Sequence, residues 1–263
     1  MMNKSVFLCP VCAGSLENKE GSLKCPSGHS FDIAKQGYVN LLLKNGSCKR
    51  HGDDALMVKA RKTFLDKGYY SKMRDALCEI VGKGNVVLDA GCGEGYYTEA
   101  LSKDNTVVGI DISKNALKYA ARRVKDTPFA VASVSDIPLA DNSLDVIVSI
   151  FAPESLDEFK RLLKQGGRLI TVEPMEGHLL ELKSAIYDNP YANPPLVLQR
   201  EGFRFKSGRE IKYQIEISTN EDIENLFKMT PYYYKTSVAD QQKLKKISSL
   251  KIGLEFYIAE YEI

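Results

Sequence analysis

The segment that most constrains the fold is NVVLDAGCGEGYYTEAL, which runs from Asn85 to Leu101. Val86, Val87 and Leu88 form a short apolar run, which is typical of a buried parallel strand. A glycine-rich turn follows, and the residues after it favour a helix with one apolar side. A strand, a glycine turn and a helix in this order form the first unit of a doubly wound nucleotide-binding sheet. We therefore expect an α/β fold.

The turn carries the pattern D-x-G-x-G-x-G, whereas a dinucleotide-binding fold prefers G-x-G-x-x-G. Gly91 and Gly93 let the backbone approach a ligand closely. The acids Asp89 and Glu94 make a poor cradle for a pyrophosphate, but they suit a cationic ligand such as one bearing an amino group. The loop therefore predicts a site for a small molecule with a positive charge.

A second apolar strand lies within TVVGIDIS and ends at Asp111, twenty-two residues after Asp89. An acid at this strand end can accept hydrogen bonds from both hydroxyls of a ribose. Asp111 could instead cap a helix that starts near Ser113. Together with the glycine loop, the position favours ribose binding.

Three cysteines and one histidine precede this unit with the spacing C-x2-C-x12-C-x3-H. Two close pairs on tight turns are typical of a tetrahedral zinc site, and a redox-active or disulfide-bonded pair is the alternative. The predicted ligands are Cys9, Cys12, Cys25 and His29. Because the protein fills all four positions, we expect a structural zinc that supplies the folding energy of this short segment.

Composition narrows the class of protein further. The chain of 263 residues has scattered remaining cysteines, which favours a reducing compartment, and no apolar run of membrane-spanning length. Residues 1–84 hold 14 Lys/Arg against 8 Asp/Glu, whereas residues 85–263 hold 22 against 26. A basic front end suggests a polyanion as partner, although lysine-rich faces are also common as plain solvated surface.

The motifs resemble the class I S-adenosylmethionine-dependent methyltransferases, whose seven-stranded sheet carries helices on both faces. SVSDIPLADNSLDVIVSIFAP and LLKQGGRLITVEP are similar to the regions of that family's third to fifth strands. From Cys9 to about Lys235 the chain resembles, more narrowly, the bacterial 23S rRNA (guanine-N1)-methyltransferases of the RlmA type. The matching stretches are CPVC, CPSGHSFDIAKQGYVNLL, GDDALMVKARKTFLDKGYY, LDAGCGEGYYT, FAP, GHLLELK and KMTPYYYK.

The resemblance implies three parts: a zinc-binding domain (1–35), a linker and helical lid (36–84) and a methyltransferase domain (85–263). It implies S-adenosylmethionine and structural Zn²⁺ as cofactors, a 23S rRNA hairpin as partner, no membrane, and a cytoplasmic location. A homodimer stays open. Branches of this family act on neighbouring guanines of one hairpin, with consequences for macrolide sensitivity.

The resemblance also assigns roles to single residues. Tyr70 would close over the cofactor, or it is a buried aromatic after a helix turn. His178 matches a cofactor contact, or it is a local hydrogen-bond partner at a helix start. Tyr232, Tyr233 and Tyr234 are candidates for stacking on RNA bases, with core packing as the alternative.

Guanine N1 carries a proton, so its deprotonation, or hydrogen bonding that favours the enolate at O6, has to accompany attack, and a carboxylate near N1 would serve. The candidates, in order of preference, are Asp53, Glu181 and Glu173, each of which could also be a cap or an exposed acid. Asp53 is in addition the expected N-cap of a helix from about Asp53 to Lys67. Two other functions remain: a small-molecule methyltransferase in which zinc is a structural clasp, and an RNA-binding protein without catalysis.

Overall fold

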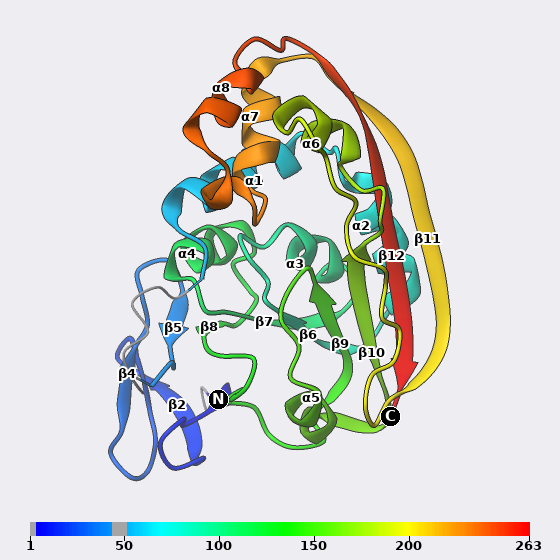
Figure 1. The fold of residues 1–263 in the computed structure, drawn as a ribbon. Helices are drawn as coiled ribbons and strands as arrows, with labels where there is room; N and C mark the ends of the chain where they lie inside the picture. Colours follow the sequence, from blue (N-terminus) through cyan, green and yellow to red (C-terminus); the bar gives the residue numbers. More distant parts are fainter. Residues whose placement is uncertain (1–3, 44–51) are drawn as a thin grey trace.

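The computed structural model describes residues 4–43 and 52–263 (Figure 1). Its main sheet has eight strands in the order β11-β12-β10-β9-β6-β7-β8-β5. β12 runs antiparallel to both of its neighbours, while the pairs from β10 to β5 are parallel. The strands are β5 (Tyr38–Asn40), β6 (Val86–Ala90), β7 (Thr106–Asp111), β8 (Phe129–Val131), β9 (Leu144–Ile150), β10 (Leu163–Pro174), β11 (Arg204–Ile217) and β12 (Leu250–Glu262).

The predicted first unit is present: β6 leads through the glycine turn into α3 (Tyr96–Leu101), and β7 leads into α4 (Lys114–Arg123). The α/β prediction is therefore confirmed. Seven strands match the expected sheet, and β5 adds an eighth at the edge beside β8. The segment expected to be a linker thus contributes a strand to the main sheet.

Helices and the small domain cover the two faces of this sheet. Val87 and Val107 belong to a buried cluster with α2 (Ser71–Val81) and α3. Leu88 and Val108 alternate with them along the strands and belong to a second cluster with α5 (Leu156–Leu162). Side chains on both faces are buried because a parallel sheet is covered on both sides, which explains the continuous apolar runs.

The amino-terminal unit packs on the same face as α5. It is a four-stranded sheet of β1 (Lys4–Leu8), β2 (Ser15–Lys19), β3 (Ser22–Lys24) and β4 (Ser30–Asp32). Its buried side chains Phe7, Leu16 and Leu23 share one cluster with the main sheet, and the Leu8 amide donates to the Pro138 carbonyl at 2.8 Å. Residues 132–143, which connect β8 to β9, contain no helix. The small unit therefore covers the face that this connection leaves open.

α1 (Ala55–Asp66) follows the small unit, and its start corrects one prediction. The N-cap is Asp54, whose carboxylate accepts from the amides of Leu56 (2.9 Å) and Met57 (3.0 Å). Asp53 is one residue too early to reach these amides and forms an ion pair with Arg61 instead.

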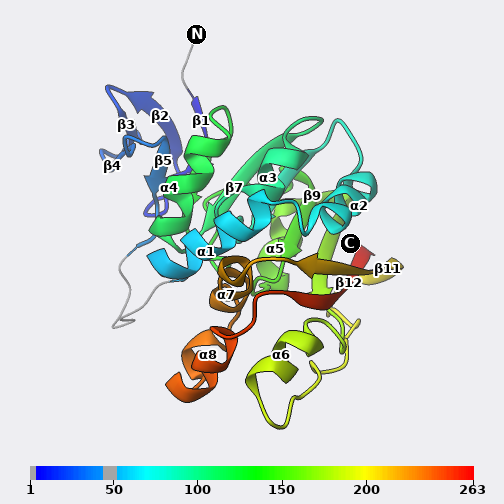
Figure 2. The same ribbon diagram turned by 90° about the horizontal axis from the view of Figure 1, so that it is seen from above.

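The remaining helices lie at the end of the molecule to which β9 and β10 point (Figures 1 and 2). They are α6 (Leu180–Ile186), α7 (Asn220–Lys228) and α8 (Val238–Leu244), with the 3-10 helix η1 (Tyr233–Lys235) between the last two. In the described part of the chain, no helix combines the length and apolar character needed to cross a membrane.

Candidate functional site

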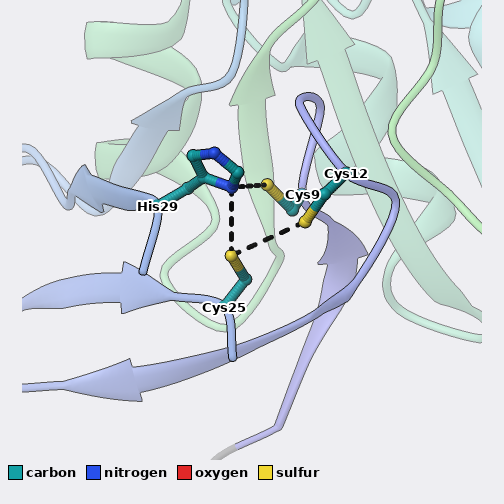
Figure 3. A group of neighbouring side chains, drawn as sticks. All are labelled: Cys9, Cys12, Cys25 and His29. Carbon is teal, nitrogen blue, oxygen red and sulfur yellow. Dashed lines mark hydrogen bonds between the residues drawn. The ribbon is translucent and has the colours of Figure 1, made fainter. Parts of the chain in front are cut away.

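The four predicted zinc ligands meet between two turns of the small unit (Figure 3). Cys9 and Cys12 follow β1, while Cys25 and His29 lie between β3 and β4. Their ligand atoms all lie within 4.8 Å of one another. His29 Nδ1 lies 3.5 Å from Cys9 Sγ and 3.3 Å from Cys25 Sγ, and the sulfurs of Cys12 and Cys25 are 3.7 Å apart.

These separations fit a tetrahedral metal. With Zn–S and Zn–N bonds of about 2.3 and 2.0–2.1 Å, ligand atoms at tetrahedral corners lie about 3.5–3.8 Å apart. Hydrogen bonds from the backbone at Gly14 and from His29 lower the pKa of Cys12 to about 6, which favours the thiolate that binds zinc. The donor set and its spacing therefore fit a structural Zn²⁺, with His29 coordinating through Nδ1.

Two of the three glycines in the loop have different tasks. Gly91 has φ +83°, and a Cβ there would lie 2.6 Å from Cβ of Ala152, in the segment after β9. Gly93 has φ +57°, but a Cβ there would meet nothing within 4 Å. Gly91 is thus needed for close packing, whereas Gly93 borders open space where a ligand fits.

Two buried acids lie beside this loop. Asp89 is 1 % exposed and accepts a hydrogen bond from Thr98 Oγ1 at 2.6 Å, and burial raises its pKa to about 7. Glu94 is 2 % exposed, burial raises its pKa, and its Oε1 has no hydrogen-bond partner within the described ranges. A buried carboxylate oxygen without a donor is costly, so the arrangement fits a ligand that brings a cationic donor.

Asp111 lies at the end of β7 and faces the same loop. Its Oδ2 accepts from the Gly93 amide at 2.9 Å and its Oδ1 from the Ser113 amide at 2.7 Å. The side chain that caps α4 is Ser113, which accepts from the Ala116 amide. Asp111 therefore holds the glycine loop in place, and each of its oxygens keeps acceptor capacity for a ligand hydroxyl.

Arg61 is a residue whose role the sequence did not reveal. It projects from α1, pairs with Asp53, and feels the charges of Glu94 and Asp111, which raise its pKa against the opposing effect of burial. In the sequence Asp53 lies 8 residues before Arg61, a spacing that predicts no contact, and only the fold places both beside the loop acids.

Tyr70 and His178, to which the resemblance assigned cofactor contacts, lie together. Both are buried, the Tyr70 hydroxyl lies 3.4 Å from His178 Nε2, and both rings contact Phe256. His178 Nδ1 accepts from the Glu255 amide, so Nε2 carries the proton of the neutral ring. Burial and then the Lys183 charge lower the pKa of His178 to about 3, so the ring stays neutral at physiological pH.

The three candidate general bases all have partners. Asp53 pairs with Arg61, Glu173 with Arg200, and Glu181 accepts from the Gly253 amide at 3.0 Å. Glu173 lies near the end of β10, directly after Val172, which pairs with Ile150 at the end of β9. Burial raises the pKa of Glu173. The fold does not bring these three acids together into one cluster.

The three tyrosines around η1 differ in exposure. Tyr232 and Tyr233 pack against Phe227, with ring centroids 5.9 and 5.2 Å away. Tyr234 is 51 % exposed and its hydroxyl donates to the carboxylate of Asp54 at the start of α1. Only Tyr234 thus offers a large open ring, while the other two pack on the helix before them.

Comparisons with known proteins agree with this geometry. Residues 7–44 match the family model described as RlmA, N-terminal, and residues 88–171 match one described as Methyltransferase domain. Among solved structures, the YcgJ protein of Bacillus subtilis has a TM-score of 0.51 at 15 % identity, covering 72 % of this chain and 97 % of that one. An S-adenosylmethionine-dependent methyltransferase from Aquifex aeolicus also has a TM-score of 0.51, at 19 % identity and coverages of 81 % and 100 %. The protein is a class I methyltransferase with an added zinc-binding unit.

Two relatives narrow this class. A Bacillus subtilis protein with the provisional name 23S rRNA (guanine-N(1)-)-methyltransferase YxjB is 33 % identical over 95 % of both chains. The 23S rRNA (guanine(748)-N(1))-methyltransferase of Streptomyces fradiae is 37 % identical over 68 % of this chain and 66 % of its own. The chain belongs to the RlmA family of 23S rRNA (guanine-N1)-methyltransferases.

Proposed function

We propose that the protein transfers a methyl group from S-adenosylmethionine to N1 of a guanine in a hairpin loop of 23S rRNA, in the cytoplasm. The supporting observation is the likeness to the Bacillus relative along 95 % of the chain, which includes the zinc unit as well as the glycine loop. The residues concerned lie in one chain, so the proposal holds for a monomer and for a homodimer.

The residues around the glycine loop would hold the cofactor. The unpartnered oxygen of Glu94, with Asp89 behind it, suits the amino group, and Asp111 suits the ribose hydroxyls. Tyr70 and His178 would contact the cofactor from the side of α2 and α6. When bound, S-adenosylmethionine supplies an electrophilic methyl group, and the protein's main task is to align the guanine with it.

Guanine N1 bears a proton that has to leave as the new N1–carbon bond forms, and a carboxylate is suited to accept it. Of Asp53, Glu181 and Glu173, we favour Glu173. It follows Val172, which pairs with Ile150 at the end of β9, so it lies at the carboxyl edge of the sheet. Burial, and then the Glu154 charge, raise the pKa of Glu173 against the effect of Arg200, which favours proton uptake.

The basic front end would contact RNA phosphates. Lys35 lines one surface depression together with Arg122 and Lys125, so that cations from the small unit's border and from the end of α4 lie side by side. Lys44, another lysine of the basic front end, lies outside the described residues. Phosphate contacts of this kind make RNA binding weaken as salt rises, because bound counterions are released.

The decisive experiment is mass mapping of methylated nucleotides in 23S rRNA from cells with and without the gene. We expect one N1-methylguanine to disappear from the rRNA of the deletion strain and to return with the intact gene. The competing function, methylation of a small molecule, predicts unchanged rRNA and no salt-dependent binding of the purified protein to RNA.

A further inference from the structure

The backbone is strained at two bulky residues that lie around His178. Five non-glycine residues of the described segments have positive φ: Ala13, Glu20, Asn142, Phe151 and Leu179. The first three lie in turns away from the glycine loop, and the left-handed conformation is common in turns. Phe151 (φ +53°) has a ring near His178, and Leu179 (φ +61°) follows His178 in sequence. Such strain in bulky residues is costly and tends to occur at functional sites.

The strain at Phe151 turns its ring outward. Phe151 directly follows Ile150, which is 7 % exposed, and its amide still continues the ladder by donating to Val172 at 3.1 Å. The Phe151 side chain is nevertheless 46 % exposed. Its ring centroid lies 6.5 Å from His178, with the planes 28° apart, and 5.9 Å from Phe256. The ring is therefore supported on its inner side and open to solvent on the other.

The position of Phe151 connects it to the cofactor site. The next residue, Ala152, lies so close to Gly91 that only a glycine fits there. Phe151 thus directly precedes a residue that packs against the glycine loop, and it lies at the carboxyl end of the central parallel strand β9. Ligands of open α/β sheets bind in this region.

We propose that the exposed face of Phe151 is the surface on which the extruded target guanine stacks during methylation. This inference rests on the proposed function and adds the residue that holds the base. Guanine N1 lies on the edge that is paired in a duplex, so the base has to leave its stack before it reacts. An open aromatic ring beside the cofactor site replaces the lost stacking, and its flat face leaves the N1 edge free.

The test measures methyl transfer from labelled S-adenosylmethionine to 23S rRNA prepared from the deletion strain. Phe151→Ala should lower kcat/KM for RNA by about 5- to 150-fold, the range expected for loss of one base–aromatic stack. Phe151→Tyr, which keeps the ring, should stay within about twofold of the wild type. Phe205→Ala is the matched control, because Phe205 has a similar exposure of 42 % on β11.

A stability measurement separates substrate contact from a structural role. Phe151→Gly removes the ring but relieves the positive φ, so it should melt at or above the temperature of Phe151→Ala while transferring methyl groups equally poorly. Affinity for S-adenosylmethionine should stay unchanged in all variants. Full activity of Phe151→Ala, or a fall in cofactor affinity that matches the fall in activity, would overturn the stacking role. Wild-type protein that leaves this rRNA unmodified would instead overturn the proposed function, and the stacking role with it.

Discussion

The zinc cluster and the cofactor site differ in how they are assembled. The four predicted zinc ligands come from one segment of 21 residues, Cys9 to His29, and two turns bring them together. The residues proposed to surround the cofactor come from α1, the glycine loop, the ends of β7 and β9, and the start of α6. Local spacing therefore specifies the first site almost completely, whereas the second depends on the whole sheet.

This difference predicts different responses to mutation. Each zinc ligand is one of four groups that share one ion, so loss of any of them removes a large part of the binding free energy at once. At the cofactor site, separate groups hold separate parts of the ligand, so single changes should give graded losses. The following predictions test this contrast from the largest expected effect to the smallest.

Cys25→Ala should have the largest effect. We expect elemental analysis to find about one zinc per chain in the wild type and almost none in the variant, because structural zinc contributes roughly 10–16 kcal/mol of apparent folding free energy. The sequence alone predicts that the front segment unfolds first and that the sheet domain stays largely intact. Because Phe7, Leu16 and Leu23 share a buried cluster with the main sheet, we now expect the sheet to melt earlier as well.

Cys78→Ala provides the control for this prediction. Cys78 is a half-buried free thiol on α2, outside the cluster, so its loss should leave the zinc content unchanged. If Cys25→Ala kept its zinc and its melting temperature, the four residues would not be a zinc site. The contrast between a locally specified metal site and a cofactor site built from distant segments would then fail.

Gly93→Val should come second, with S-adenosylmethionine binding weakened by more than about 100-fold in calorimetry. A valine at φ +57° is strained, and its side chain would fill the open space beside the loop. Gly166→Val separates these two causes, because Gly166 has φ +76° and also has open space around it, but lies away from the loop. Equal loss of binding in both variants would show that strain alone, and no blocked ligand, explains the effect.

The same contrast explains what the sequence could predict. The spacing from Cys9 to His29 predicted a cluster of four possible ligands, and the fold brings these four side chains together. The apolar run before the glycine turn predicted the first strand and helix, because both signals are local. The ion pair of Asp53 with Arg61, the outward ring of Phe151 and the packing of the small unit on the sheet were missed. Each depends on tertiary contacts, which one segment's periodicity does not encode.

Asp111→Ala should come third and weaken S-adenosylmethionine binding by about 10- to 150-fold, which corresponds to roughly 1.5–3 kcal/mol for hydrogen bonds to a charged group. The loss has two sources, the ribose hydroxyls and the support that Asp111 gives to the Gly93 amide. Asp145→Ala is a matched control, because Asp145 also accepts from a strand amide, that of Val86, at the other end of β6. Unchanged affinity in Asp111→Ala would contradict the ribose role.

The smallest expected effect is a pH dependence of cofactor affinity. Burial raises the pKa of Asp89 to about 7, above its unfolded value of 3.8, so the folded free protein holds this proton between about pH 4 and 7. Folding stability from this group therefore falls as pH rises through that window and is level above it. A bound amino group favours the charged carboxylate, so binding releases the proton and affinity should rise about tenfold from pH 5.5 to pH 7.

Both pH values lie below the pKa of an α-amino group, about 7.7–8.0, so the cofactor itself stays cationic over this range. Calorimetry with 5′-methylthioadenosine, which lacks the amino acid part, should show a flat affinity over the same interval. Asp89→Asn should flatten the profile for S-adenosylmethionine, because the amide does not titrate. A slope that persists in Asp89→Asn would point to Glu94, the other buried acid beside the loop, as the titrating group. Either result would show that cofactor binding at this site releases a proton from a buried carboxyl group. At the zinc cluster, metal binding releases protons from the thiols instead.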